Sequence, residues 1–279
     1  MNEPLKKTVL IKKTVLKRRL EKLYKNFDRS MISPDPLECV PTKGRFEDIE
    51  LSAFIASAFA YGRADLIVRT VRRILDELGP NPHRMLVSGK YGTLYRGFKY
   101  RFHKRADLIW LLGRLEKICK KYGTIENAFS LKSGSMKDRI AAFSAMFTNE
   151  KGLSPSRRFL VPSPLNGSAC KRMNLFLRWM VRSDAVDLGI WKSITPSELI
   201  IPLDVHVRRI ASRIGLVSGG AASFKAAEEL TRNMKALNPT DPVRYDFAIC
   251  SLGKLGRCTK KPDPLYCKTC ALKDFCSIR

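Results

Sequence analysis

Four cysteines near the end of the chain have the residue type and the spacing of a metal site. They follow the pattern C-x8-C-x2-C-x5-C and are Cys258, Cys267, Cys270 and Cys276. Cysteine thiolates are the ligands of iron–sulfur clusters and of many structural zinc sites. Because the four thiols share one loop that also holds glycine and proline, they can surround a single tetrahedral or cubane centre. The spacing therefore predicts one metal centre.

A lysine and an aspartate upstream have the residue types of a second chemistry. Lys171 follows the turn Leu165-Asn166-Gly167-Ser168-Ala169-Cys170, and Asp204 stands where a helix is expected to begin. An amine whose pKa is lowered by burial or by neighbouring cations can attack a sugar carbon, and a carboxylate can stabilise the resulting cation or accept a proton. The plainer alternatives are a surface lysine in the first turn of a helix and an aspartate that caps one.

The charge balance of the chain favours a polyanionic partner. Its 279 residues include 52 Lys and Arg against 26 Asp and Glu, a net charge of +26. Neutralising phosphates releases counterions, so this surplus predicts nucleic acid as the partner, DNA first, with RNA not excluded. An anionic membrane surface and a charge that serves only solubility are the alternatives. No apolar run is long enough to span a bilayer, so no membrane segment is expected.

Composition also bounds the class of protein. Hydrophobic residues make up 44% of the chain, which is enough for a core and argues against a disordered polymer. The eight cysteines do not predict a secreted disulfide scaffold, because such domains are usually short and the N-terminus lacks a signal-peptide pattern. We therefore expect a reducing, cytoplasmic setting. The remaining cysteines are expected to be buried and reduced: Cys39, Cys119, Cys170 and Cys250.

The elements that must position these residues are expected to be helices, so the predicted fold class is all-α. Hydrophobic periodicity predicts helices over residues 49–60, 65–78, 105–121 and 137–147 in the first half of the chain. No β-hairpin signal appears in that half. The basic segment 1–30 nearly repeats Lys-Lys-Thr-Val-Leu, and it is either a mobile arm on phosphates or a solvated leading helix.

The second half places the candidate residues on predicted helices. A helix over 168–182 has an apolar stripe and an opposite stripe of polar residues, Lys171, Asn174, Arg178 and Arg182. A helix from Asp204 to about residue 214 has Arg208, Arg209 and Arg213 on its outward side, which fits either a solvated face or phosphate contact. His206 on this helix is expected to pack or to donate a hydrogen bond. A further helix covers 224–237, and residues 243–252 lead into the cysteine loop.

The order of these three features resembles the helix-hairpin-helix DNA glycosylase superfamily, the endonuclease III type in particular. That family has a hairpin L-P-G-V-G-x-K, then V-D-x-H-V-x-R-x-x-x-R, and ends in C-x6-C-x2-C-x5-C around a [4Fe-4S] cluster. Here the corresponding stretches are 165–171, 201–210 and the cysteine loop. The sequence of residues 168–174 is also similar to that of an uncharacterised bacterial family related to that superfamily. The resemblance covers about residue 160 to the end.

The resemblance implies a two-lobed helical fold and roles for individual residues. Lys171 matches the nucleophile and Asp204 the catalytic carboxylate, and the four loop cysteines match ligands of a [4Fe-4S] cluster, with zinc as the alternative. The implied activity is that of a DNA glycosylase, with or without AP-lyase activity; the alternative is a catalytically silent module that binds DNA or RNA. Residues expected at the nucleic acid are Gly167, Ser168, Arg172, Arg178, Arg208, Arg209, Lys254, Arg257, Lys260 and Lys261.

The resemblance also divides the chain into segments, and a few positions of the chain depart from the family's pattern. It implies a basic segment 1–30, a helical core 31–249 that holds the hairpin and helix 163–182 and the aspartate helix 203–214, and a metal loop 250–279. A monomer without an obligate protein partner is the family's usual state. Asn166 replaces the usual proline, Ala169 replaces the second glycine, and the first cysteine gap is wider. Trp191, Tyr61 and Phe98 are weak candidates for a base pocket or wedge.

Overall fold

The computed structural model describes residues 3–278, with side chains from residue 12 onward. The described chain is 59% helix and 2% strand, which confirms the all-α prediction. It forms two compact units. Unit 1 holds the N-terminal segment to Met31, Ser168–Asn174 and the chain from Thr195 onward, and unit 2 holds Ile32–Gly167 and Leu175–Ile194. The first and last of the predicted segments therefore both belong to unit 1.

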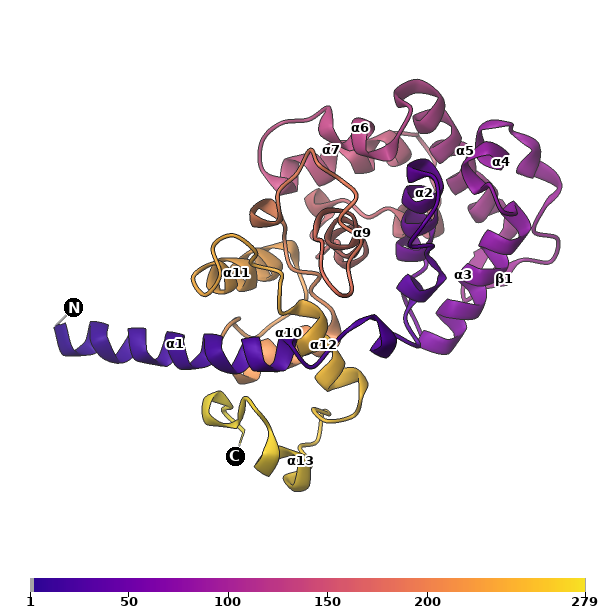
Figure 1. Cartoon of the computed structure of the whole chain (residues 1–279). Helices are drawn as coiled ribbons and strands as arrows, with labels where there is room; N and C mark the ends of the chain where they lie inside the picture. Colours follow the sequence, from indigo (N-terminus) through magenta and orange to yellow (C-terminus); the bar gives the residue numbers. More distant parts are fainter. Residues whose placement is uncertain (1–2, 279) are drawn as a thin grey trace. The chain divides into compact units, whose positions relative to one another are not determined.

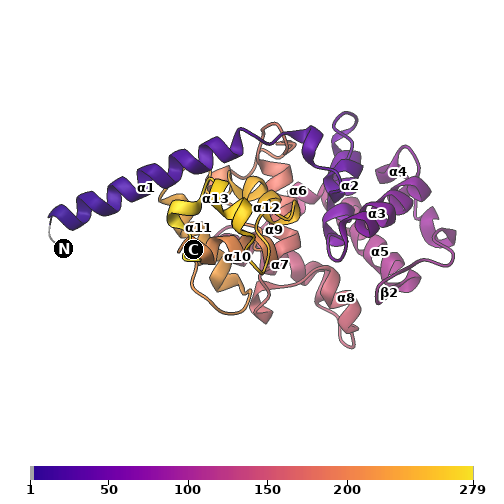
Figure 2. The ribbon, with the colours of Figure 1, turned by 90° about the horizontal axis from the view of Figure 1, so that it is seen from below.

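Unit 1 is built from a long leading helix and a group of shorter ones (Figures 1 and 2). Its helices are α1 (Glu3–Tyr24), α10 (Val205–Arg213), α11 (Phe224–Lys235), α12 (Asp246–Lys254) and α13 (Pro264–Thr269). The leading segment is thus helical, and its later turns bury Leu16, Leu20 and Leu23, which share one face. Glu21 accepts a hydrogen bond from the Tyr245 hydroxyl at 2.6 Å, so this part of α1 is fixed beside α12.

Unit 2 surrounds one hydrophobic helix with amphipathic ones. Its helices are α2 (Phe46–Ala58), α3 (Ala64–Leu78), α4 (Pro82–Val87), α5 (Arg105–Tyr122), α6 (Ile125–Ser130), α7 (Met136–Thr148) and α8 (Pro155–Leu160). Helix α2 is apolar on nearly all sides and is buried along almost its whole length. Phe54 of α2 packs against Phe143, Phe147 and Phe176 with ring centroids 5.2–5.9 Å apart, and these rings form the centre of the core.

Sequence patterns set several helix ends. Helix α3 ends where predicted, because Gly79 adopts a left-handed backbone (φ +80) and Pro82 then opens α4. Ser135, Ser154 and Ser223 cap the starts of α7, α8 and α11 through their side chains. Short 3-10 turns complete the connections at Arg29–Met31, Pro36–Cys39, Lys90–Thr93, Pro164–Asn166, Pro196–Glu198 and Lys273–Phe275.

Unit 2 contains a small β-hairpin that the sequence does not signal. Strands β1 (Lys99–Tyr100) and β2 (His103–Lys104) are antiparallel, with Tyr100 opposite His103. The strands are too short for an alternating pattern, and the turn residues Arg101 and Phe102 are not those that usually mark a hairpin. Within the described chain, no helix is long and apolar enough to cross a membrane.

Helix α9 (Lys171–Val181) belongs to both units. Its first turn, to Asn174, is counted with unit 1, and the rest with unit 2. The later turns are buried on every side, with Phe176, Leu177, Trp179 and Met180 fully enclosed. A helix so enclosed has no solvated face, so its polar residues must find partners inside the protein.

Candidate active site and cysteine loop

The turn before α9 exposes its first half and buries its second. Pro164–Asn166 form a 3-10 turn that ends at Gly167, whose φ of +75 a residue with a side chain rarely adopts. Leu165, Asn166 and Gly167 are exposed. The N–H of Gly167 donates to the carbonyl of Pro164 at 3.2 Å, which closes the turn.

A second left-handed residue stands directly before Lys171. Cys170 has φ +47, which is strained for a residue with a side chain, and its N–H donates to the Ser168 hydroxyl at 3.1 Å. Ala169, at the position of the family's second glycine, does not have a positive φ. Both Ala169 and Cys170 are buried, and burial raises the pKa of the Cys170 thiol to about 12. Lys171 therefore opens α9 from a rigid, enclosed turn and is itself half-buried.

Asp204 caps helix α10 and also accepts a thiol. Its Oδ1 accepts the N–H groups of His206 and Val207 at 2.8 and 2.7 Å, which satisfies two amides of the first turn. Its Oδ2 accepts the Cys250 thiol of α12 at 3.2 Å. Burial, with the charge of Asp204 next, raises the pKa of Cys250 well above its usual range, so the thiol keeps its proton and remains a donor.

His206 is held in its neutral form beside this carboxylate. Burial lowers its pKa most, Asp204 opposes that effect, and the charges of Arg209, Lys254 and Lys171 lower the pKa further. Arg209 donates to His206 Nδ1 at 3.0 Å, so this nitrogen carries no proton. Because Lys171 contributes to the potential at His206, the lysine and the aspartate predicted from the sequence lie in one electrostatic neighbourhood of unit 1.

Close packing of α10 on α12 depends on a glycine. A Cβ at Gly253 would lie 2.4 Å from His206 Nδ1 and 2.6 Å from its Cβ, so no larger residue fits. The site therefore includes two α12 residues, Cys250 and Gly253, that have no assigned role in the sequence analysis. A lone cysteine, half-buried here, and a helical glycine carry no motif, and only their contacts with Asp204 and His206 reveal them.

The cysteine loop is attached to α10 by two arginines. Arg209 donates to the carbonyl of Cys258 at 2.5 Å, and Arg213 donates to Cys258 Sγ at 3.0 Å and to the carbonyl of Lys260 at 2.9 Å. The guanidinium groups of these two arginines therefore turn toward the loop, and both side chains are half-buried. Arg208 on the same helix is half-buried.

The loop sulfurs suit thiolate ligands. Cys258 Sγ accepts from Arg213, and Cys270 Sγ accepts the N–H of Leu272 at 3.4 Å, whereas the Cys250 and Cys39 thiols donate. Burial raises the pKa of Cys270 most, the N–H of Leu272 opposes this effect, and the charges of Cys258, Cys276 and Cys267 raise the pKa further. Among the described residues, no three or more His, Cys, Asp or Glu side chains already converge as a metal-binding group. The donor set fits a thiolate-bound centre in its chemistry.

The predicted phosphate-binding residues separate into exposed and buried ones. Gly167, Lys254, Arg257, Lys260 and Lys261 are exposed, and Ser168, Arg208 and Arg209 are half-buried. The prediction is wrong for Arg172 and Arg178, which are buried. Arg178 is 2% exposed and donates to Asp187 at 3.1 Å, so its guanidinium stabilises unit 2 internally.

The suggested wedge residues are also mostly internal. Trp191 and Phe98 are buried, and Trp191 Nε1 donates to Glu50 at 2.8 Å, so both belong to the core of unit 2. Tyr61 is half-buried and lies among other aromatic rings. A single tryptophan or phenylalanine carries no periodic pattern, so the sequence does not distinguish a buried ring from an exposed one at these positions.

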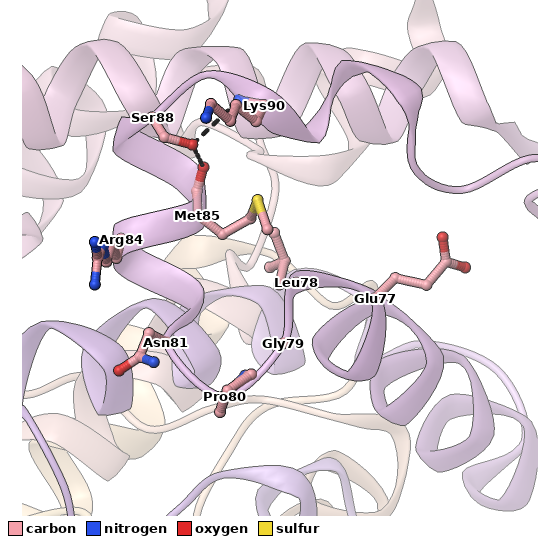
Figure 3. A pocket seen from close by; sticks show the side chains of 9 residues that line it. All are labelled: Glu77, Leu78, Gly79, Pro80, Asn81, Arg84, Met85, Ser88 and Lys90. Atoms are coloured by element: carbon pink, nitrogen blue, oxygen red, sulfur yellow. Dashed lines mark hydrogen bonds between the residues drawn. The ribbon is translucent and has the colours of Figure 1, made fainter.

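A surface pocket of about 320 Å3 lies elsewhere in unit 2, where α3 ends and α4 begins (Figure 3). Leu78, Pro80 and Met85 form its apolar part, and Arg84 and Lys90 are also among its lining residues. Glu77, its acidic lining residue, already accepts from Arg73 and from the N–H of Tyr95. None of the predicted site residues lines this pocket.

Comparison with known proteins identifies the chain by family alone. No curated protein matches it, and no solved structure matches it either. The family described as "Protein of unknown function (DUF2400)" matches residues 35–255, a stretch that includes Lys171, Asp204 and Cys250 and ends before Cys258. Because this match spans most of the sequence, the chain belongs to the DUF2400 family.

Proposed function

We propose that this protein is a DNA-binding enzyme of base excision, a DNA glycosylase with AP-lyase chemistry at Lys171. One observation carries the proposal. Lys171 opens α9 from a strained turn, and its charge acts on the same histidine that Asp204 acts on. An amine and a carboxylate in one partly enclosed, cation-rich region are the groups that this reaction requires. The helix-hairpin-helix arrangement around Lys171 is part of this proposal.

The chemistry follows from the two groups. The neutral amine of Lys171 attacks the sugar C1′, the new C–N bond forms as the bond to the base breaks, and the base leaves with the electron pair and takes up a proton. Asp204 stabilises the positive charge that develops on the sugar and accepts a proton from the attacking amine. Ring opening then gives a Schiff base, and loss of a C2′ proton expels the 3′ phosphate with its electron pair.

The cysteine loop is proposed to hold a [4Fe-4S] cluster through Cys258, Cys267, Cys270 and Cys276. The sulfurs that accept N–H groups support thiolate ligands, and such bonds are common around these clusters. The cluster would supply structural stability, and the loop would present its exposed cations, Lys254, Arg257, Lys260 and Lys261, to phosphates. Anaerobically purified protein should be brown with about four irons per chain; colourless protein with one zinc would contradict the cluster.

Trapping the covalent intermediate tests the enzyme directly. Full-length protein is incubated with abasic-site DNA and borohydride, which delivers hydride to the Schiff-base carbon and fixes the adduct. We expect an adduct with the wild type and with Lys132→Ala, a change of an exposed lysine in unit 2, and none with Lys171→Ala. Base release without an adduct, lost in Asp204→Asn, would indicate a glycosylase without lyase activity.

A second candidate function is binding without catalysis. It is favoured by Asp204, whose two oxygens already accept two amides and a thiol and thus have structural roles. In that case the protein would bind nucleic acid in a salt-sensitive manner. The absence of both adduct and base release over a broad panel of lesions, with binding retained, would exclude the enzyme in favour of this module.

A further inference from the structure

Two exposed aromatic rings stand together at the tip of the β-hairpin in unit 2. Phe102 is 50% exposed and Phe159, in α8, is 39% exposed, and their centroids are 5.1 Å apart with the rings at 78°. Tyr61, half-buried, lies 4.9 Å from Phe159 and 5.9 Å from Phe102. We call these three residues the aromatic platform. The proposed excision chemistry uses none of them.

Buried hydrogen bonds hold the platform rigidly. His103 is fully buried, and its Nε2–H donates to the carbonyl of Ser156 at 2.8 Å, so its Nδ1 accepts the hydroxyl of Tyr61. The Tyr100 hydroxyl donates to the carbonyl of Tyr61. These bonds connect the hairpin to Tyr61, which follows α2, and to Ser156 of α8, so they join the three segments that carry the platform.

The hairpin turn is strained at a charged residue. Arg101 has φ +53 at the first central position of a two-residue turn, where glycine is usual. Gly62 makes room for it, since a Cβ there would lie 2.9 Å from the Tyr100 hydroxyl and 3.3 Å from a guanidinium nitrogen of Arg101. Glycine at position 101 would relieve the strain, so the arginine at this position points to a role for its charge.

Exposed cations lie beside the platform residues in the chain. Arg101 precedes Phe102 and Arg158 precedes Phe159, and both arginines are exposed. Lys99 and Lys104, an exposed cross-strand pair, extend from the face of the hairpin opposite to Tyr100 and His103, which contact the platform rings. The platform therefore combines flat apolar faces with two neighbouring cations that are available to phosphate.

We propose that the aromatic platform stacks an unpaired base of a single-stranded nucleic acid, with Arg101 and Arg158 at the flanking phosphates. Bases stack on aromatic faces regardless of sequence, and a basic rim follows the backbone. A lipid or apolar-peptide partner would instead favour a wider aliphatic surface. The proposal goes beyond base excision, because the platform lies wholly in unit 2, while Lys171 and Asp204 lie in unit 1.

Fluorescent oligonucleotides test the stacking. An unstructured DNA strand with a 2-aminopurine base reports stacking as quenching, and anisotropy reports affinity. We expect the wild type to quench and Phe102→Ala to bind on the order of 10-fold more weakly with less quenching. Phe102→Trp should retain both properties. Leu131→Ala, which removes a 59% exposed side chain elsewhere in unit 2, is the matched control and should bind as the wild type does.

Arg101→Gly separates binding from folding. This change should raise the unfolding midpoint, because it relieves the positive φ, and should weaken strand binding and its salt dependence, because it removes a cation. An RNA strand of the same sequence distinguishes the two nucleic acids. Equal affinity and quenching in Phe102→Ala, or ring-dependent binding of anionic vesicles in place of the strand, would overturn the proposal. Failure of the borohydride adduct would leave this result unchanged.

Discussion

Two helices, α9 and α10, carry arginines that the sequence assigns to the same phosphate-binding role, and their guanidinium groups have different surroundings. In α9, Arg178 is buried and pairs with Asp187 of the following loop; Arg182, the residue just after the helix, is also buried and pairs with Asp184 and Asp187. In α10, Arg209 and Arg213 donate to carbonyls and a sulfur of the cysteine loop and remain partly accessible.

The difference shows what a row of basic residues on a helix leaves undetermined. The acids that neutralise the α9 arginines do not lie on the helix, and their loop is shaped by its own bonds: Asp184 Oδ1 accepts the N–H groups of Val186 and Asp187, both at 2.8 Å. Gly189 is required there, because a Cβ would lie 2.4 Å from that of Ser183. The α9 arginines are thus part of a core, and the α10 arginines are attachments of a surface loop.

Removing the shared acid of α9 should have the largest effect on stability. Asp187→Ala leaves two buried guanidinium groups without their main partner, and breaking a buried pair in this way costs about 3–5 kcal/mol. Urea unfolding followed by circular dichroism measures the change. If Asp187→Ala does not fold, Asp187→Asn can replace it, because it keeps the side-chain volume and some hydrogen bonding. Its free energy of unfolding should lie between those of the wild type and Asp187→Ala.

The matched control is an exposed pair in the same unit. Arg63 donates to Asp65 at 2.9 Å, and both side chains are well exposed, so Asp65→Ala should leave the free energy of unfolding nearly unchanged. A similar loss in Asp65→Ala and Asp187→Ala would show that burial does not distinguish the α9 arginines.

Glu50 extends the comparison, because it is a buried carboxylate whose hydrogen-bond donors are backbone and indole N–H groups instead of arginines. Its Oε1 accepts the N–H groups of Glu126 and Trp191 Nε1, and its Oε2 accepts that of Ile125, at 2.7–2.8 Å. In Glu50→Gln the amide nitrogen must face one of these donors, and an unsatisfied buried group costs about 1–3 kcal/mol. Glu47→Gln, on the same helix in a more exposed pair, should change stability by less than about 0.5 kcal/mol.

The pH dependence of this effect has a definite sign. Burial raises the pKa of Glu50 from 4.5 to about 7, so the folded state binds its proton more tightly than the unfolded state does. The stabilising contribution is complete below the unfolded pKa and is lost as pH rises toward 7. The advantage of the wild type over Glu50→Gln in urea unfolding should therefore shrink between pH 5 and 8, two values that bracket about 7. A difference that is constant over this range would contradict the raised pKa.

These cases indicate which parts of the molecule the sequence predicts. Helices with a strong apolar period appear near their predicted bounds, as α3 and α5 do, and Asp204 begins α10 because a cap depends on its neighbours in the chain. The sequence does not predict the burial of Arg178 or the hydrogen bond from the Cys250 thiol to Asp204. In both cases the partner residue lies outside any periodic pattern. The sequence does not signal the hairpin at Arg101, because its strained turn lacks the residues that ordinarily form one.

A smaller effect on stability than those at Asp187 and Glu50 is expected from Arg213. Arg213→Gln removes the bonds to Cys258 Sγ and to the carbonyl of Lys260, but the loop keeps the bond from the Cys258 N–H to the carbonyl of Leu252 at 2.9 Å. We expect the free energy of global unfolding to fall by less than about 1 kcal/mol. Hydrogen exchange at the Cys258 amide should become about 5- to 10-fold faster, because only the loop opens.

The distribution of exchange rates decides between an attachment and a core element. In Arg213→Gln, the amide of Ile249 in α12, which donates to Tyr245 at 3.0 Å, should exchange as slowly as in the wild type. Arg208→Gln removes a charge from the same helix without touching the loop bonds and should leave the Cys258 amide unchanged. If Arg213→Gln instead speeds exchange throughout α10 and α12 and destabilises the protein as much as Asp187→Ala, the α10 arginines are core residues like those of α9, and the cysteine loop is inseparable from the fold of unit 1.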